Sequence, residues 1–144
     1  VPLLAQQLEA AGFKVTQDVR EYNQIESEAL AGKFHAVLVS RSTVLDSGDA
    51  VAYMTADFSS SGSYSMSGLH DEKVDAAISK AAAAEPGDER RKAIMAAEQA
   101  ILATGAAIPL AHERVIQGEA AGVTGAERDP DERALITSAT TVKK

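Results

Sequence analysis

Cysteine and tryptophan are both missing from this chain, and aromatic residues make up only 4% of its 144 residues. The lack of cysteine excludes disulfides, thiolate nucleophiles and cysteine-ligated zinc sites. Basic residues are in deficit, because 14 Lys and Arg face 21 Asp and Glu, which leaves a net charge of −7. This balance repels phosphate backbones and anionic membrane surfaces, so nucleic acid is not an expected partner. A chain of this length suits one domain with a core of Ala, Val, Ile and Leu.

Apolar spacing along the chain predicts five helices and three strands. Helices are expected to end at Gly12 and Gly32, because glycine tolerates the left-handed conformation that follows a helix. A short helix is expected over 51–57, and two longer ones follow Asp71 and the Pro86-Gly-Asp88 break, with apolar stripes that make a helical hairpin. The strand candidates are residues 13–19, 36–40 and 107–111, and the second has the composition of a central, doubly covered strand.

Five short segments carry the motifs on which a family resemblance rests. One is residues 43–53, TVLDSGDAVAY, which resemble a W-x-x-D-x-x-D/E-P segment. The other four are residues 8–15 (a helix-to-strand join), Tyr64 with Val74-Asp75 (Y-x-N-x-x-V/I-D), Asp88 to Arg91 (a D-x-x-x-R helix start) and 107–110 (a P-x-I-P-L strand). In this set and order they resemble the family 5 extracellular solute-binding proteins, the peptide, dipeptide and nickel receptors of ABC importers. The resemblance spans about the first 125 residues.

The resemblance implies an α/β fold: a lobe like the type II periplasmic binding proteins, with a mixed sheet flanked by helices. Residues 1–123 would form the C-terminal lobe, and 124–144 would return to the other lobe or form a disordered tail. The chain would then be a portion of a larger two-lobed protein. That protein would work outside the cytoplasm, in the periplasm or lipid-anchored on the outer face of the membrane, and would deliver its ligand to an ABC permease.

The expected ligand site lies around Asp46, in a short acidic loop that follows a strand candidate. Ligands of open α/β sheets bind at such edges. In the family, the carboxylate matching Asp46 pairs with the ligand's α-ammonium group through a charge-assisted hydrogen bond. The other candidate contacts are Thr43, Arg41, Ser42 and Asp49. The alternative is that Asp46 and Asp49 only form a turn and cap a helix.

The chain departs from the family at Thr43, where tryptophan is usual, and at Ala50, where proline is usual. Thr43 supplies neither the flat apolar wall nor the indole donor of tryptophan. The expected ligand is therefore a peptide or another small polar solute. Tyr53, Tyr64 and Met66 either line a cleft or serve as core and loop anchors.

Other functions are less well supported by the sequence. His35, His70 and His112 have no metal-ligand spacing, so no metal and no cofactor is expected. Neither a nucleophile elbow nor a phosphate-binding glycine loop is present, and the chain is not expected to be an enzyme. Two alternatives stay open: a ligand-sensing domain of a transcription regulator, and an interaction module that binds no solute.

Overall fold

The computed structural model describes residues 1–41, 48–112, 116, 118–127 and 136–143. Within these residues the secondary structure is helical apart from one short ladder. The helices are α1 (Pro2–Ala10), α2 (Tyr22–Leu30), α3 (Ala50–Phe58), α4 (Glu72–Ala83) and α5 (Asp88–Ala103), and the strands are β1 (Val123–Thr124) and β2 (Thr141–Val142).

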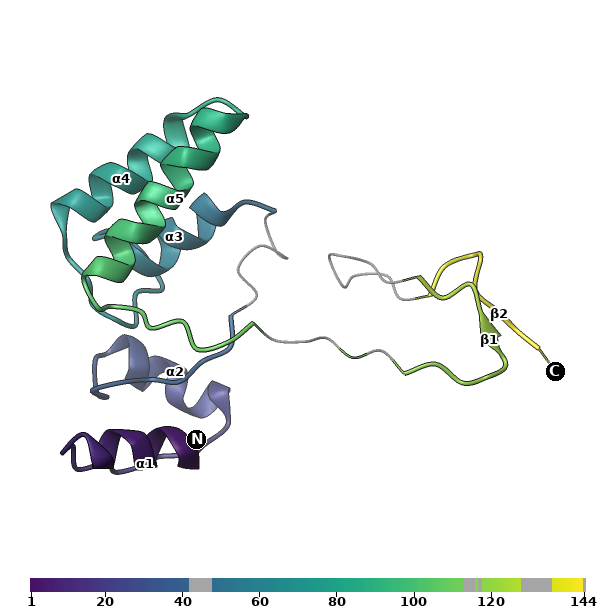
Figure 1. Cartoon of the computed structure of the whole chain (residues 1–144), viewed down its shortest axis with the longest axis horizontal. Coiled ribbons are helices and arrows are strands. Elements are labelled where there is room, and N and C mark those ends of the chain that lie inside the picture. Colours follow the sequence, from purple (N-terminus) through teal and green to yellow (C-terminus); the bar gives the residue numbers. More distant parts are fainter. Residues whose placement is uncertain (42–47, 113–115, 117, 128–135, 144) are drawn as a thin grey trace.

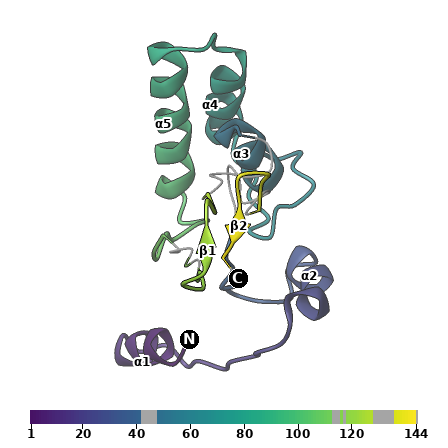
Figure 2. The same ribbon diagram turned by 90° about the vertical axis from the view of Figure 1, so that its right-hand side faces the viewer.

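The core lies between α3, α4 and α5, which we call the three-helix unit (Figure 1). On α4, Val74, Ile78 and Ala81 recur at helical spacing and are at most 3% exposed, so they form the buried face. Their partners are Ala93, Ala97 and Ile101 on α5 and Val51 and Met54 on α3. The many alanines allow α4 and α5 to run side by side as a hairpin, as Figure 2 shows.

The starts of α3 and α4 are both set by an aspartate. The side chain of Asp49 accepts a hydrogen bond from the Val51 amide at 2.9 Å, and Asp71 accepts from the amides of Lys73 and Val74. Each side chain satisfies amides that have no partner within the helix. Asp49 therefore caps α3, while a ligand contact by Asp49 stays a prediction. The predicted helical hairpin and the inward face of its first helix are confirmed.

The N-terminal helices lie apart from the three-helix unit (Figure 2). In the described part of the chain, α1 and α2 pack against no other helix or strand. Each ends before a glycine with positive φ, at Gly12 and Gly32, as the sequence predicts. Arg20 joins the chain before α2 to that helix, because its guanidinium contacts Asp18 at 2.8 Å and Glu28 at 3.1 Å.

The α/β prediction is wrong. None of the three strand candidates, 13–19, 36–40 and 107–111, forms a strand, and no mixed sheet is present among the described residues. These segments have no regular secondary structure and are mostly exposed instead; Leu38 is 53% exposed and Ile108 78%. A strand forms only when a neighbour pairs with its backbone groups, and no described segment does so here.

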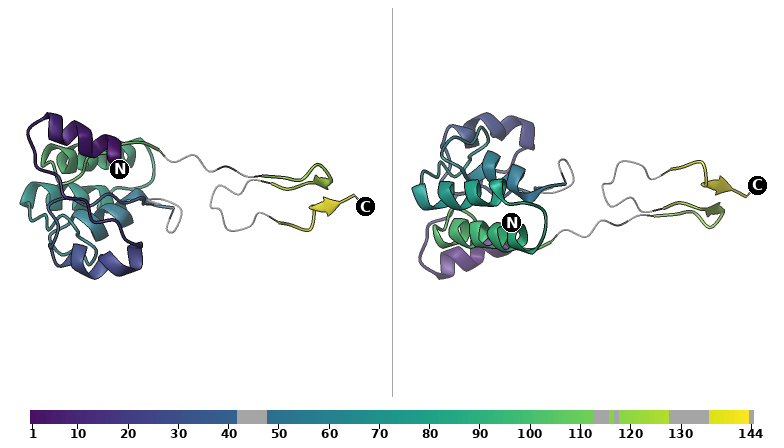
Figure 3. Two further views of the ribbon diagram at one scale, coloured as in Figure 1. Left: turned by 90° about the horizontal axis from the view of Figure 1, so that it is seen from below. Right: turned by 90° about the horizontal axis from the view of Figure 1, so that it is seen from above.

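The single described ladder is β1 with β2, paired antiparallel with Val123 opposite Val142. It lies within residues expected to be irregular, and Figure 3 shows it extending away from the helices. Residues 124–144 are therefore not wholly without regular structure. No helix in the described residues has both the length and the apolar character needed to cross a membrane.

Candidate functional site

Three of the predicted ligand contacts, Asp46, Thr43 and Ser42, lie outside the described residues. The other two, Arg41 and Asp49, stand on either side of that segment, and both make ion pairs with the three-helix unit. The described part of the candidate site therefore consists of Arg41, Asp49 and the helix residues that they contact.

Arg41 makes a two-pronged ion pair with Asp57 of α3. Its Nε donates to one carboxylate oxygen at 3.0 Å, and one terminal nitrogen donates to the other at 2.7 Å. Asp57 is only 8% exposed. It is also the penultimate residue of α3, where the helix dipole disfavours negative charge. A buried carboxylate in that position requires a cation, and the planar fork of arginine matches it best.

Two aromatic rings complete the environment of Arg41. The guanidinium carbon lies 4.5 Å from the centre of the Tyr64 ring and 5.5 Å from that of Tyr53. Both distances fall in the range of cation–π attraction. Burial raises the pKa of the Tyr53 hydroxyl, and the negative charge of Asp57 raises it further. We call Arg41, Asp57, Tyr53 and Tyr64 the Arg41 cluster.

The local backbone fixes the two tyrosines. The Tyr53 ring meets Phe58 edge-on, with ring centres 5.7 Å apart. The amide of Tyr64 donates to the carbonyl of Ala56 at 3.0 Å, which folds the chain back onto α3. Gly62 is needed in this turn, because a side chain there would collide with the Ala56 carbonyl oxygen. The anchoring alternative for these tyrosines therefore describes the contacts observed, while a role in lining a cleft stays a prediction.

Asp49 is held by Arg90 of α5, whose terminal nitrogen lies 2.6 Å from a carboxylate oxygen. The other terminal nitrogen of Arg90 donates to the carbonyls of Ala81 at 2.8 Å and Ala84 at 2.9 Å. One guanidinium thus joins the start of α3 to the end of α4, and we call these groups the Arg90 cluster. The hydrogen bond from Val51, with the Arg90 contact, holds the pKa of Asp49 below its ordinary value.

These contacts give Arg41 and Asp49 clear structural roles, and a ligand contact by either stays a prediction. Sequence reasoning missed Asp57, the buried partner of Arg41, because the two are 16 residues apart and no local spacing links them. The sequence signal that could have pointed to it is an acidic residue near the C-terminal end of a predicted helix, because the helix dipole disfavours negative charge there and favours pairing with a cation from elsewhere in the chain.

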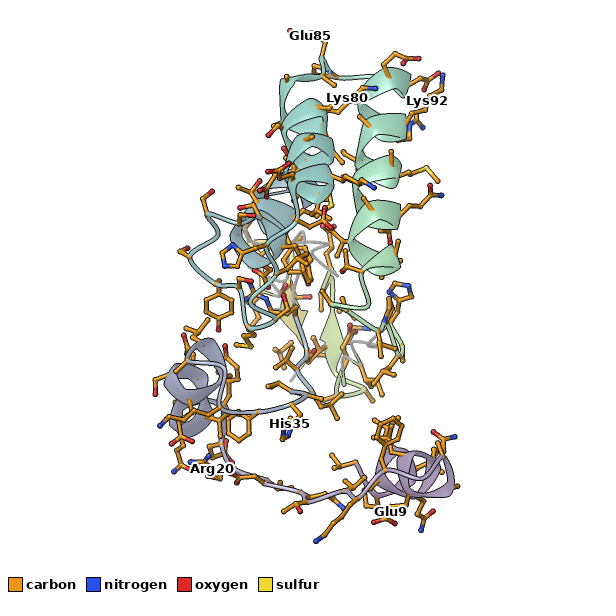
Figure 4. The ribbon with its side chains drawn as sticks, turned by 90° about the vertical axis from the view of Figure 1, so that its left-hand side faces the viewer. Glu9, Arg20, His35, Lys80, Glu85 and Lys92 are labelled. Carbon is orange, nitrogen blue, oxygen red and sulfur yellow. The ribbon has the colours of Figure 1, made fainter. Side chains whose placement is uncertain are left out.

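Figure 4 shows His35 on the chain that follows α2, and Glu85 at the turn between α4 and α5. Among the described residues, no group of three or more His, Cys, Asp or Glu is arranged to hold a metal ion.

Comparison with protein-family models, with curated proteins and with solved structures found no match to this chain.

Proposed function

We propose that this chain belongs to the substrate-binding component of an ABC importer, which captures a peptide or another small polar solute in a cleft between two lobes. The observation that supports the proposal is the order of the five segments, which follows the solute-binding family from residue 8 to residue 110. The corrected fold limits it, because Arg41 and Asp49, which flank Asp46 in the sequence, make ion pairs with the three-helix unit, and no sheet is described near them.

The chemistry would be capture by charge. The Asp46 carboxylate would pair with the ammonium group at the N-terminus of a peptide, and such a charge-assisted bond is roughly twice as strong as a neutral one. Ligand would bridge this chain and the remaining lobe of the same polypeptide, and the closed form would dock on a membrane permease. This work would take place outside the cytoplasm, with the full-length protein held by a lipid anchor.

Thermal unfolding in the presence of candidate solutes tests the proposal. Trialanine with free termini should stabilise the gene product that contains this chain, and N-acetyl-trialanine should not, because it lacks the ammonium group. Asp46→Asn should remove the stabilisation. Asp88→Asn is the matched control, because Asp88 is an exposed helix residue that pairs only locally, with Arg91.

The isolated chain should bind trialanine weakly or not at all, since the other lobe would supply half of the contacts. Calorimetry that shows micromolar binding by the isolated chain would contradict the two-lobed mechanism. A panel of peptides, amino acids, sugars and nickel that leaves the unfolding temperature unchanged would instead favour an interaction module. A helix-turn-helix encoded in the same gene would favour the ligand sensor of a transcription regulator.

A further inference from the structure

We propose that Asp57, Tyr53 and Tyr64 form a binding site for a guanidinium group, which Arg41 occupies within the chain and which an external guanidinium ligand occupies when Arg41 is absent. All four residues of the Arg41 cluster belong to the described part of the chain. The inference goes beyond the proposed function, because it assigns a second site with a ligand chemistry of its own.

The three residues match the shape and charge of a guanidinium. This cation is planar, with N–H groups along its edge and a weakly hydrated face, so a carboxylate suits the edge and an aromatic ring suits the face. Asp57 accepts two edge hydrogen bonds, at 3.0 and 2.7 Å, and the tyrosine ring centres lie 4.5 and 5.5 Å from the guanidinium carbon. An ammonium group is a point charge and cannot make the same set of contacts.

The backbone brings these three residues together. Tyr53 and Asp57 are four residues apart on α3, so their side chains leave the same face of the helix. Tyr64 joins them because the chain after α3 folds back, where its amide donates to the carbonyl of Ala56 at 3.0 Å. The helix and the returning chain thus set the positions of both rings and of the carboxylate.

The returning chain is also tied to the helices on its way. The amide of Ser60 donates to the carboxylate of Asp75 on α4 at 2.8 Å, and the hydroxyl of Ser59 donates to the carbonyl of Thr55 at 2.7 Å. None of these contacts involves the side chain of Arg41. The site should therefore keep its shape when that side chain is removed.

The vacated site would still require a cation. Asp57 is only 8% exposed and lies at the negative end of α3, so burial and the helix dipole both disfavour its charge. The side chain of Arg41 is itself 35% exposed, so its removal opens the site to solvent. A guanidinium from outside can then restore the fork and both ring contacts.

Replacement of the side chain by a small molecule tests the site. Ethylguanidinium carries the same N–H edge as arginine, and it is added to the 144-residue chain with Arg41→Ala. The chain has three tyrosines, so Tyr22→Phe in every variant leaves only the two of the site visible in NMR spectra of the rings. Their signals should shift saturably, with a dissociation constant on the order of 1–10 mM. Concentrations up to about 50 mM lie far below those at which guanidinium unfolds proteins.

The controls separate the guanidinium from its parts. Ethylammonium has the charge without the fork and ethylurea has the planar fork without the charge, so each should bind at least about fivefold more weakly. The chain that retains Arg41 should respond about tenfold more weakly, because its own guanidinium is held at the site at a high effective concentration. Arg91→Ala, which removes an exposed arginine with a local partner, should respond like that chain. Adding Asp57→Asn to Arg41→Ala should abolish saturation.

A second variant covers a failure of Arg41→Ala to fold, which circular dichroism detects. Arg41→Lys keeps a cation beside Asp57 but loses the fork, so ethylguanidinium should displace the lysine at lower concentrations than it needs against Arg41. The absence of a saturable shift in both variants overturns the proposal. Equal binding of ethylguanidinium and ethylammonium overturns it as well.

A further ligand distinguishes the two sources of a guanidinium. Tighter binding of N-acetylarginine amide than of ethylguanidinium assigns the site to an arginine side chain of a peptide, and the reverse order assigns it to a small free guanidinium compound. Trialanine carries no guanidinium, so its binding tests the proposed function alone.

Discussion

Replacement of Arg90 by leucine should destabilise the three-helix unit far more than the same change at its neighbour Arg91. Arg90 contacts α4, and it also contacts the residue that caps α3, so its loss removes contacts with two other helices at once. Arg91 pairs only with Asp88 on its own helix, and both side chains are largely exposed. Leucine preserves most of the apolar stem at either position, so the comparison isolates the guanidinium.

The size of the effect follows from the individual contacts. Hydrogen bonds to a charged donor contribute about 1.5–3 kcal/mol each, but the carbonyls of Ala81 and Ala84 share one nitrogen, so together they supply about 2 kcal/mol. The partly exposed ion pair with Asp49 adds about 0.5 kcal/mol after screening. We therefore expect Arg90→Leu to cost about 2–3 kcal/mol, and Arg91→Leu less than about 0.5 kcal/mol.

Urea unfolding followed by circular dichroism at the helical band measures both values. Arg90→Lys should fall between them, because lysine keeps the positive charge at the end of α4 but cannot reach carbonyls and carboxylate at the same time. Equal losses for the two leucine variants would refute the reasoning, since the guanidinium of Arg90 would then contribute no more than an exposed surface charge.

Two further predictions concern the same unit. Ile78→Ala should cost about 2–4 kcal/mol because it opens a cavity in the core, whereas Met95→Ala, at a position 57% exposed, should cost less than about 1 kcal/mol in the same urea assay. Hydrogen bonds from Val51 to Asp49 and from Ser60 to Asp75 keep the pKa values of these two aspartates in the folded chain below the ordinary 3.8. The stabilisation that these two carboxylates give the fold is complete above their unfolded pKa values and is lost as pH falls through their folded pKa values. At pH values below about 4, the urea concentration at the unfolding midpoint should therefore decrease, and it should decrease less in Asp49→Asn.

The helices could be predicted because their signals are local. Asp49 and Asp71 mark helix starts, Gly12 marks an end, and the spacing of apolar residues on α4 identifies the buried face. Each of these features acts within one or two turns, so the neighbouring sequence is sufficient to specify it. The weaker part of this prediction concerned Met95 and Leu102, which widen the apolar stripe of α5 in sequence but remain exposed.

The strands could not be predicted correctly because their signal is incomplete. The run 36–40 shows that its side chains favour burial, but it carries no information about which backbone would pair with it. In the structure Leu38 and Val39 stay exposed on extended chain. Conversely, β1 and β2 are two residues each and show no alternation of apolar and polar residues, yet they pair. Thr124 and Thr141, which are 17 residues apart, share a hydrogen bond of 2.7 Å between their hydroxyl groups.

The contacts of the residues that flank the candidate site could not be predicted for the same reason. Residues 41–49 stand out by composition, but Arg41 and Asp49 make their ion pairs with α3 and α5, which lie later in the chain. Ser59 illustrates the limit from another side: it begins a serine-rich run typical of a mobile loop, but it is buried and bonded to the end of α3. Amino-acid composition does not register such contacts, since each depends on the path of the backbone.

The carboxylates of Asp49 and Asp57 lie at opposite ends of α3, and their electrostatic positions decide which of the two ion pairs matters more. Asp49 sits at the positive end of the helix and accepts an amide hydrogen bond there, so its charge is favourable even without Arg90. Asp57 sits at the negative end, buried, and Arg41 is its ion-pair partner there. Loss of Arg41 therefore leaves a buried carboxylate without its cation, whereas loss of the Asp57 charge leaves a guanidinium that is already one-third exposed and can turn to water. The attachment of the N-terminal half to the three-helix unit thus depends more on Arg41 than on any charge at the start of α3.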